Sequence, residues 1–284
     1  MTFHRPEEII KDDEKGASEL LEDVIVSIER LEEKDIKDYL EKLVRKRYTM
    51  TPLVNLANNV FISMDKGRDI EREIQALKYS FLSLRAEAAE EMKRVLREKG
   101  KKKVLTLSRS STVLQILSEV EKAVVLESRP MKEGRKVAEY LSGKGVNVEY
   151  WIDAGLCKAL KNVDCAVIGA DSISTDGFLN KIGSRPLAVI SEEVGKDLYV
   201  VADSSKILPR GIPVPESESH PPEEVWDTSA KIDVKNDYFE LTELEKARYI
   251  TEEGVKTPVE IKKTAEEKGV SERLLEIHPL VREK

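Results

Sequence analysis

The sequence predicts an α/β protein, with an N-terminal helical domain at residues 1–100 and a Rossmann-like parallel-sheet domain at residues 101–284. Up to about residue 98, apolar residues recur at three- and four-residue spacing, which is typical of amphipathic helices. After Lys103, short apolar runs alternate with helical patterns, which indicates βαβ units and a parallel sheet. The length of 284 residues suits this division, since domains average roughly 150 residues.

Two long helical patterns fill most of the first hundred residues, at 20–46 and 70–100. Between them, Thr51 and Pro52 predict the start of a further helix, because proline is favoured at the first helical position. The second pattern closes on Gly100, which is followed by three lysines. Glycine after the last turn and cations near it are typical of a helix C-terminus.

Five short β-rich runs follow, and each is nearly continuously apolar, as expected of strands covered by helices on both faces. These runs are residues 104–108, 123–128, 147–152, 165–171 and 197–203. The proline-rich stretch at 208–226 predicts a loop. Residues 237–278 predict a short strand and then helices, the first of which opens with Thr257 as N-cap and Pro258 at the first helical position.

Composition excludes several classes of protein. Lys plus Arg is 47 and Asp plus Glu is 54, and the net charge of −7 argues against direct nucleic-acid binding, which depends on neutralising phosphates. No apolar run approaches the roughly 20 residues that cross a bilayer, and no signal peptide is recognised at the N-terminus. We therefore expect a cytoplasmic protein without a membrane partner. The charged fraction of 36%, with two cysteines, is typical of a thermophile.

Neither a metal nor another cofactor is predicted. The two cysteines, Cys157 and Cys165, cannot build a disulfide framework and fit no zinc pattern. The chain has no GxGxxG motif, so ordinary NAD binding is unsupported.

Candidate site residues are sought where the strands end, because ligands of open α/β sheets bind beyond the carboxyl ends of the strands. The first strand is followed by Ser108, Arg109, Ser110 and Ser111, just before a predicted helix. Hydroxyls, backbone N–H groups and the guanidinium of Arg109 suit a phosphate. A serine N-cap without any ligand explains the same pattern and is the more common case.

The other strand ends carry charged residues. Arg129 follows the second strand, and there it favours either a bound phosphate or carboxylate, or a surface ion pair. Asp171 ends the fourth strand, nine residues before Asn180 and Lys181. A buried acid is costly unless it is paired or working, so Asp171 is a candidate general base or a structural partner of Lys181. Lys206, after the fifth strand, either reaches a phosphate or is simply solvated.

Taken together, these segments resemble a known family. The matching segments are residues 15–18, 52–56, 106–117, 127–130, 169–184, 200–206 and 239–245. Among them, GAD at 169–171 followed by NKIG at 180–183 is fairly specific. The family contains the alpha, beta and delta subunits of translation initiation factor 2B, their archaeal homologues, and isomerases of methylthioribose 1-phosphate and ribose 1,5-bisphosphate.

The resemblance implies a helical domain on a Rossmann-like domain, dimerisation through the latter, and a sugar phosphate bound between the domains. The isomerases use a cysteine at the first strand end and an aspartate at the GAD position to move protons between C1 and C2. Asp171 matches that aspartate, but Ser108 stands at the cysteine position. A serine hydroxyl needs an adjacent base, and losing an acid–base partner costs roughly 10²- to 10⁴-fold in rate. Arg109 also replaces a small polar residue.

The leading hypothesis is an archaeal, regulatory initiation factor 2B-like protein that binds a nucleotide monophosphate such as AMP, or a sugar phosphate, and is weakly or not catalytic. Expected protein partners are a second copy of the chain and an initiation factor 2 subunit. The alternative is an aldose–ketose isomerase of a phosphorylated ribose, with Asp171 and Ser108 as the proton-transfer pair. A third class is a structural module without a ligand. The predicted ligand-binding residues are Lys15, Gly16, Ala17, Ser108, Arg109, Ser110, Ser111, Arg129, Asp171, Asn180, Lys181 and Lys206.

Overall fold

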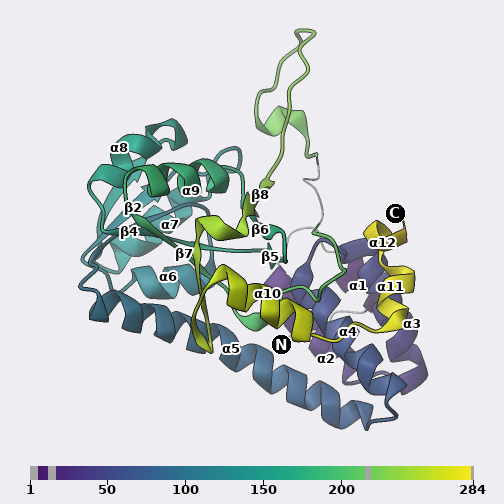
Figure 1. The fold of residues 1–284 in the computed structure, drawn as a ribbon. Coiled ribbons are helices and arrows are strands. Elements are labelled where there is room, and N and C mark those ends of the chain that lie inside the picture. Colours follow the sequence, from purple (N-terminus) through teal and green to yellow (C-terminus); the bar gives the residue numbers. More distant parts are fainter. Residues whose placement is uncertain (1–5, 12–16, 215–218, 283–284) are drawn as a thin grey trace.

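The computed structural model of the chain describes residues 6–11, 17–214 and 219–282. Within this part, the main sheet has seven strands in the order β10–β9–β7–β4–β1–β2–β3, with helices against both faces (Figure 1). All neighbouring strands in it are parallel except the pair β9 and β10. The strands are β1 Lys103–Thr106, β2 Lys122–Leu126, β3 Asn147–Trp151, β4 Cys165–Gly169, β7 Asp197–Val201, β9 Arg248–Thr251 and β10 Gly254–Lys256.

The five predicted strands all form, and the predicted fold class is confirmed. Helices alternate with them as the apolar patterns predict: α6 Ser111–Leu117, α7 Gly134–Gly143, α8 Leu156–Lys161 and α9 Ser184–Glu193. Short 3-10 turns lie at η1 Asp153–Gly155, η2 Ser204–Lys206, η3 Pro222–Glu224 and η4 Leu244–Lys246. No helix in the described ranges is both long and apolar enough to cross a membrane.

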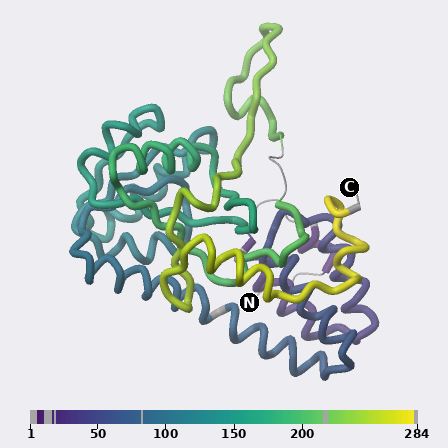
Figure 2. The backbone as a smooth tube through the Cα atoms, viewed as in Figure 1, coloured from purple at the N-terminus to yellow at the C-terminus, as the bar shows by residue number. Residues whose placement is uncertain are grey.

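The helical part is built from α1 Pro6–Lys11, α2 Ala17–Ile28, α3 Glu33–Arg47, α4 Thr51–Asp65 and α5 Ile70–Glu98. Helix α5 has 29 residues and is about 44 Å long at 1.5 Å per residue. Its first half packs Ile74 and Phe81 into the helical core, and its second half packs Ala89 and Met92 against the sheet. One helix therefore runs along both parts of the molecule (Figure 2).

The end of the chain returns to the helical part. Helix α10 Pro258–Glu267 starts with the predicted cap, since the Thr257 side chain accepts a hydrogen bond from the backbone N–H of Glu260. After it come α11 Glu272–Ile277 and α12 Pro279–Arg282. Leu274 and Ile277 of α11 belong to the same apolar core as α2 to α4. The division at residue 100 stays a prediction.

A second, smaller sheet lies beside the main one. Its antiparallel strands are β5 Ser172–Ile173, β6 Gly177–Lys181 and β8 Phe239–Glu243. Strand β6 carries Asn180 and Lys181, and the sequence did not predict a strand there, since Gly, Asn and Lys are depleted in strands. Between β7 and β8, residues 219–238 project away from the body, as Figures 1 and 2 show.

Candidate functional site

Five side chains meet at the carboxyl edge of the main sheet, and we call them the carboxyl-edge cluster: Ser108, Glu133, Asp171, Lys181 and Lys206. Asp171 follows β4, and its backbone N–H donates to the carbonyl oxygen of Leu179 in β6, at 2.9 Å. This bond sets β6 beside the end of β4. Lys181 of β6 pairs with Glu133 at 3.0 Å, and Glu133 accepts from Ser108 Oγ at 3.2 Å.

The surroundings of Asp171 disfavour loss of its carboxyl proton. Removal from water raises the pKa of its carboxyl, Lys206 and Lys181 oppose that change, and the Glu133 carboxylate adds to it. The net pKa is raised above the ordinary value of an aspartate. A carboxyl with a raised pKa beside a second, lysine-paired carboxylate is a common arrangement for an acid and a base in one site.

Lys206 is held by contacts from the helical part and the C-terminal part. Asn55 of α4 donates from Nδ2 to the carbonyl oxygens of the two residues that flank Lys206, at 2.6 and 2.9 Å. Lys268 donates from Nζ to the carbonyl oxygens of Ser204 and Ile207, at 2.5 and 2.9 Å. Burial lowers the pKa of Lys268 to about 8. These bonds fix the turn that carries Lys206.

Ser108 has a left-handed backbone, with φ of 68°. Its backbone N–H donates to Ser128 Oγ at 2.8 Å, and Ser128 is itself left-handed, with φ of 64°. The Asp153 carboxylate accepts the backbone N–H groups of Ser128 and Arg129, each at 2.8 Å. Left-handed residues other than glycine cost on the order of 1–3 kcal/mol each and gather at functional sites. Ser108 is thus held firmly in an uncommon conformation.

Glu133 is the cluster residue that the sequence did not identify. One carboxylate oxygen, Oε1, contacts Ser108 and Lys181. The other, Oε2, is buried and has no hydrogen-bond partner among the residues described. A side chain at Gly134 would place its Cβ 1.9 Å from the carbonyl oxygen of Leu126, so only glycine lets the chain approach β2 there. The sequence signal that could have identified Glu133 is its position next to Gly134, at the start of α7.

Three other predicted residues have partners within the chain. Asn180 is buried, and its Nδ2 donates to Ser184 Oγ at 2.9 Å. The guanidinium of Arg129 donates to the carbonyl oxygen of Val225, at the base of the projecting segment, at 3.0 Å. Ser110 is the N-cap of α6, as its simpler interpretation predicts.

The remaining predicted residues are less constrained. Ser111 begins α6, and Arg109 is exposed. Ala17 begins α2, whereas Lys15 and Gly16 lie outside the described residues. The contribution of these residues to a site stays a prediction.

The projecting segment also reaches the cluster through Tyr238. Lys181 Nζ lies 4.8 Å from the centre of the Tyr238 ring, and this ring stacks on His220 at 3.5 Å. Tyr238 Oη donates to Glu224, and this bond lowers the pKa of the Glu224 carboxyl. The cluster is therefore joined to both the smaller sheet and the base of the projection.

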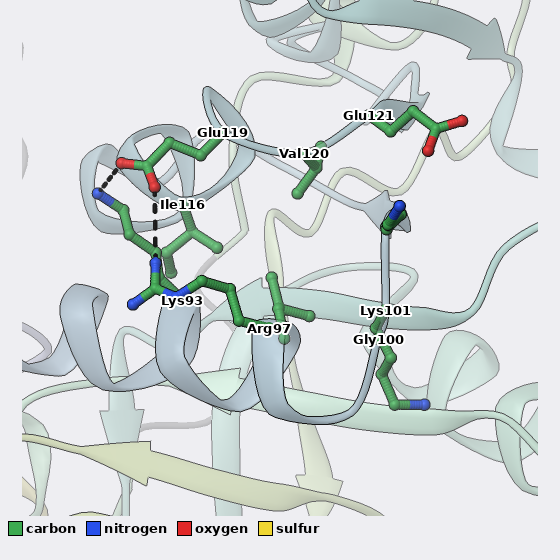
Figure 3. Close-up of a pocket in the computed structure, with 10 residues that line it drawn as sticks. Lys93, Arg97, Gly100, Lys101, Ile116, Glu119, Val120 and Glu121 are labelled. Atoms are coloured by element: carbon green, nitrogen blue, oxygen red, sulfur yellow. Dashed lines mark hydrogen bonds and ion pairs between the residues drawn. The ribbon is translucent and has the colours of Figure 1, made fainter.

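At the opposite edge of the sheet lies a pocket of about 470 Å³, which we call the amino-edge pocket (Figure 3). Two of its lysines are paired: Lys93 lies 2.5 Å from Glu119, and Lys101 lies 3.0 Å from Asp197. The pocket is lined by Lys93, Leu96, Arg97, Gly100, Lys101, Lys102, Ile116, Glu119, Val120 and Glu121. Across the described part of the chain, no group of three His, Cys, Asp or Glu side chains is arranged to hold a metal.

A helical part on a Rossmann-like sheet defines the fold class, in which ligands bind beyond the carboxyl ends of the strands. Lysines and carboxyls gather at that edge here. Comparison with known proteins gives the family. The chain belongs to the initiation factor 2 subunit family, whose model matches residues 7–258. The family resemblance expected from the sequence is confirmed.

Two groups of relatives match most of the chain: proteins named as isomerases and proteins named as initiation factor subunits. The ribose 1,5-bisphosphate isomerase of Methanocaldococcus jannaschii is 27% identical over 83% of this chain and 81% of its own length. An eIF-2B subunit 2-like protein of Pyrococcus horikoshii is 32% identical over 69% of this chain and 72% of its own. The crystal structure of translation initiation factor eIF-2B from Pyrococcus horikoshii OT3 shares the fold, with a TM-score of 0.70 and 24% identity over 89% of this chain and 95% of that one.

Proposed function

We propose that the carboxyl-edge cluster binds a phosphorylated ribose, either a free sugar phosphate or a nucleoside monophosphate such as AMP, in a regulatory role with weak or no turnover. The observation that carries this proposal is the convergence of Lys181, Lys206 and Asp171 at one edge of the sheet. Two ammonium groups suit a phosphate, and a carboxyl suits sugar hydroxyls. Ser108 at the cysteine position argues for weak turnover.

In this proposal, different predicted residues bind different parts of the ligand. Lys181 and Lys206 hold the phosphate together with the N–H groups and hydroxyls that precede α6, and Asp171 and Asn180 hold the ribose hydroxyls. Arg129 joins them by exchanging its bond to the Val225 carbonyl for one to the ligand. The remaining ligand contacts are assigned to Lys15, Gly16, Ala17, Ser108, Arg109, Ser110 and Ser111.

A thermal-shift screen tests the binding function. The probes are AMP, ribose 1,5-bisphosphate and methylthioribose 1-phosphate, with unphosphorylated ribose as the control. A ligand at one hundred times its dissociation constant stabilises the fold by about 2.7 kcal/mol, which raises Tm by roughly 5 °C for a chain of this size. No shift with any phosphorylated probe would favour the purely structural module.

A second function, the aldose–ketose isomerase, is favoured by the name of the Methanocaldococcus jannaschii relative and by the raised pKa of Asp171. Its test is ketose formation from ribose 1,5-bisphosphate and from methylthioribose 1-phosphate. Robust turnover that is lost in Asp171→Asn would favour the isomerase hypothesis over the regulatory one. Ser108→Cys is the companion variant, and a gain of activity there would indicate that serine limits the site.

The proposed protein partners are a second copy of the chain and an initiation factor 2 subunit, in the cytoplasm. Family resemblance supports both. Sedimentation equilibrium tests the first, and a homodimer should give twice the chain mass of 32.1 kDa. A monomeric mass at micromolar concentration would contradict it.

A further inference from the structure

Serine at position 108 needs a base before it can replace a thiol in proton transfer, and the structure places a carboxylate there. Ser108 Oγ donates to Glu133 Oε1 at 3.2 Å. Lys181 Nζ lies 3.0 Å from the same oxygen and is 3% exposed, so Glu133 is paired with a buried ammonium. Glu133 is therefore a carboxylate held between a hydroxyl and an ammonium group.

The second carboxylate oxygen of Glu133 can still accept hydrogen bonds. Oε2 is buried and makes no hydrogen bond to any residue in the described part of the chain. A buried, unpartnered carboxylate oxygen is costly and calls for an explanation, such as a catalytic role. Because Oε1 is held by Ser108 and Lys181, Oε2 is the oxygen whose hydrogen-bonding capacity is unused.

We propose that Glu133 is the proton acceptor of this site and Asp171 its proton donor, so that a ribofuranose carrying a phosphate on C1 can be isomerised with serine at position 108. The proposal rests on the isomerase form of the proposed function, and it makes Glu133 a catalytic residue. Ser108 then orients Glu133 instead of transferring the proton itself.

The reaction balances with these two carboxyl groups. Asp171 gives its proton to the ring oxygen as the bond from that oxygen to C1 breaks, and the bond's electron pair stays on the oxygen. Glu133 takes the proton from C2, and the C2–H electrons form the C1–C2 double bond. The C2 hydroxyl then returns a proton to Asp171 as the C2 carbonyl forms, and Glu133 delivers its proton to C1. The product is the open-chain ketose 1-phosphate, no external oxidant is needed, and both carboxyls regain their starting states.

The geometry matches these roles. Glu133 and Asp171 lie close enough for the Glu133 charge to act on Asp171, and Lys181 acts on both. Ser108 is held in its left-handed conformation by Ser128 Oγ, so its hydroxyl meets Glu133 from a fixed position. Such preorganisation is what acid–base catalysis requires.

The experiment compares the full chain with Glu133→Gln, and follows ketose formation from ribose 1,5-bisphosphate across pH. Glu139→Gln is the matched control, because Glu139 is an exposed glutamate of α7, the helix that begins directly after Glu133. The expected result is slow turnover by the wild type and a loss of 10²- to 10⁴-fold in Glu133→Gln, with the substrate-induced Tm shift preserved. Glu139→Gln should match the wild type. Glu133→Asp keeps a carboxylate and should retain more activity than Glu133→Gln.

Four outcomes would overturn the inference. A loss smaller than tenfold in Glu133→Gln would exclude Glu133 as the base. A wild-type chain that binds the bisphosphate without turnover would overturn the inference and leave the binding function standing. A wild-type chain with no Tm shift would overturn both. If Glu133→Gln fails to fold, complete loss of turnover in a folded Glu133→Asp variant also overturns the inference, since that variant still carries a carboxylate.

Discussion

The two edges of the main sheet are both rich in charge, but they use it differently. At the amino edge there is an open pocket of about 470 Å³, and its lysines are matched by carboxylates such as Glu119 and Asp197. At the carboxyl edge, Glu133 keeps a buried oxygen that has no hydrogen-bond partner in the described part of the chain, and Ser108 is held in a left-handed backbone. The amino-edge pocket is therefore not the proposed site. The proposed site is the carboxyl edge, where a carboxylate oxygen can still accept a hydrogen bond.

The contrast lies in the Glu133 carboxylate and not in the lysines, because Lys181 pairs with Glu133 at 3.0 Å and Lys206 donates to the carbonyl oxygen of Ala170 at 2.6 Å. A charge that is already matched within the chain must give up that partner before it can meet a ligand, and the loss offsets the gain. The pKa shifts follow the same division. Desolvation raises the pKa of Asp164 at the amino edge, but backbone N–H groups of Lys103 and Lys102 outweigh it, and the net pKa is lowered. The pKa of Asp171 is raised.

The largest expected effect on this contrast comes from Lys206→Ala. Removing a cation that meets a phosphate costs about 1.5–3 kcal/mol, so the dissociation constant for the best phosphorylated ligand should rise roughly 10- to 100-fold. Isothermal titration calorimetry measures it. Lys102→Ala, at the amino edge, is the control and should bind like the wild type. An equal loss in both variants would remove the distinction between the edges.

The next effect comes from Asn55→Ala, which deletes two hydrogen bonds to the turn that carries Lys206. The expected cost is about 1–3 kcal/mol in the free energy of unfolding, together with weaker ligand binding. Asn58→Ala is a matched control on the same helix, since Asn58 bonds to Gly269 and Ser271 instead. It should lose similar stability and keep the affinity. Equal affinity losses would mean that α4 does not position Lys206.

A smaller effect is expected from Asp164→Asn. The Asp164 carboxylate accepts the backbone N–H groups of Lys102 and Lys103, each at 2.8 Å. Asparagine weakens these charge-assisted bonds, so unfolding by urea should show a loss of about 1–2 kcal/mol. Ligand affinity should stay unchanged, and a clear fall in affinity would show that the two edges are coupled.

The smallest effect is a difference in the direction in which pH changes the free energy of unfolding through Asp164 and through Asp171. The ionised form of Asp164 stabilises the fold above the unfolded-state pKa near 3.8, and this contribution is lost as the pH falls through its lowered folded pKa. At a pH between the unfolded-state pKa and its raised folded pKa, Asp171 holds a proton in the folded chain that the unfolded chain has released. Its contribution is present below about 3.8 and is lost as the pH rises through its raised folded pKa.

The unfolding free energy of Asp171→Asn, relative to the wild type, should therefore rise with pH, and that of Asp164→Asn should fall. Urea titrations between pH 3 and pH 8 measure both slopes. Slopes of the same sign would contradict the opposite environments of the two carboxyls.

Local patterns in the sequence were enough to predict the main sheet, because its strands are continuous apolar runs. They were not enough for β6, which is stabilised by pairing with the distant strand β8. At the site, Asp171 and Lys206 follow strands and could be predicted from that position. Glu133 could not, since it reaches Ser108 only because Gly134 allows a close approach to β2.

The return of α11 to the helical core has a consequence for synthesis of the protein. Leu274 and Ile277 share an apolar core with Leu20 and Leu53. A ribosome adding about 5–20 residues per second needs on the order of ten seconds to travel from the first of these helices to the last. During that interval the early helices carry an uncovered apolar surface. The nascent chain should therefore depend on a chaperone until its final helices emerge.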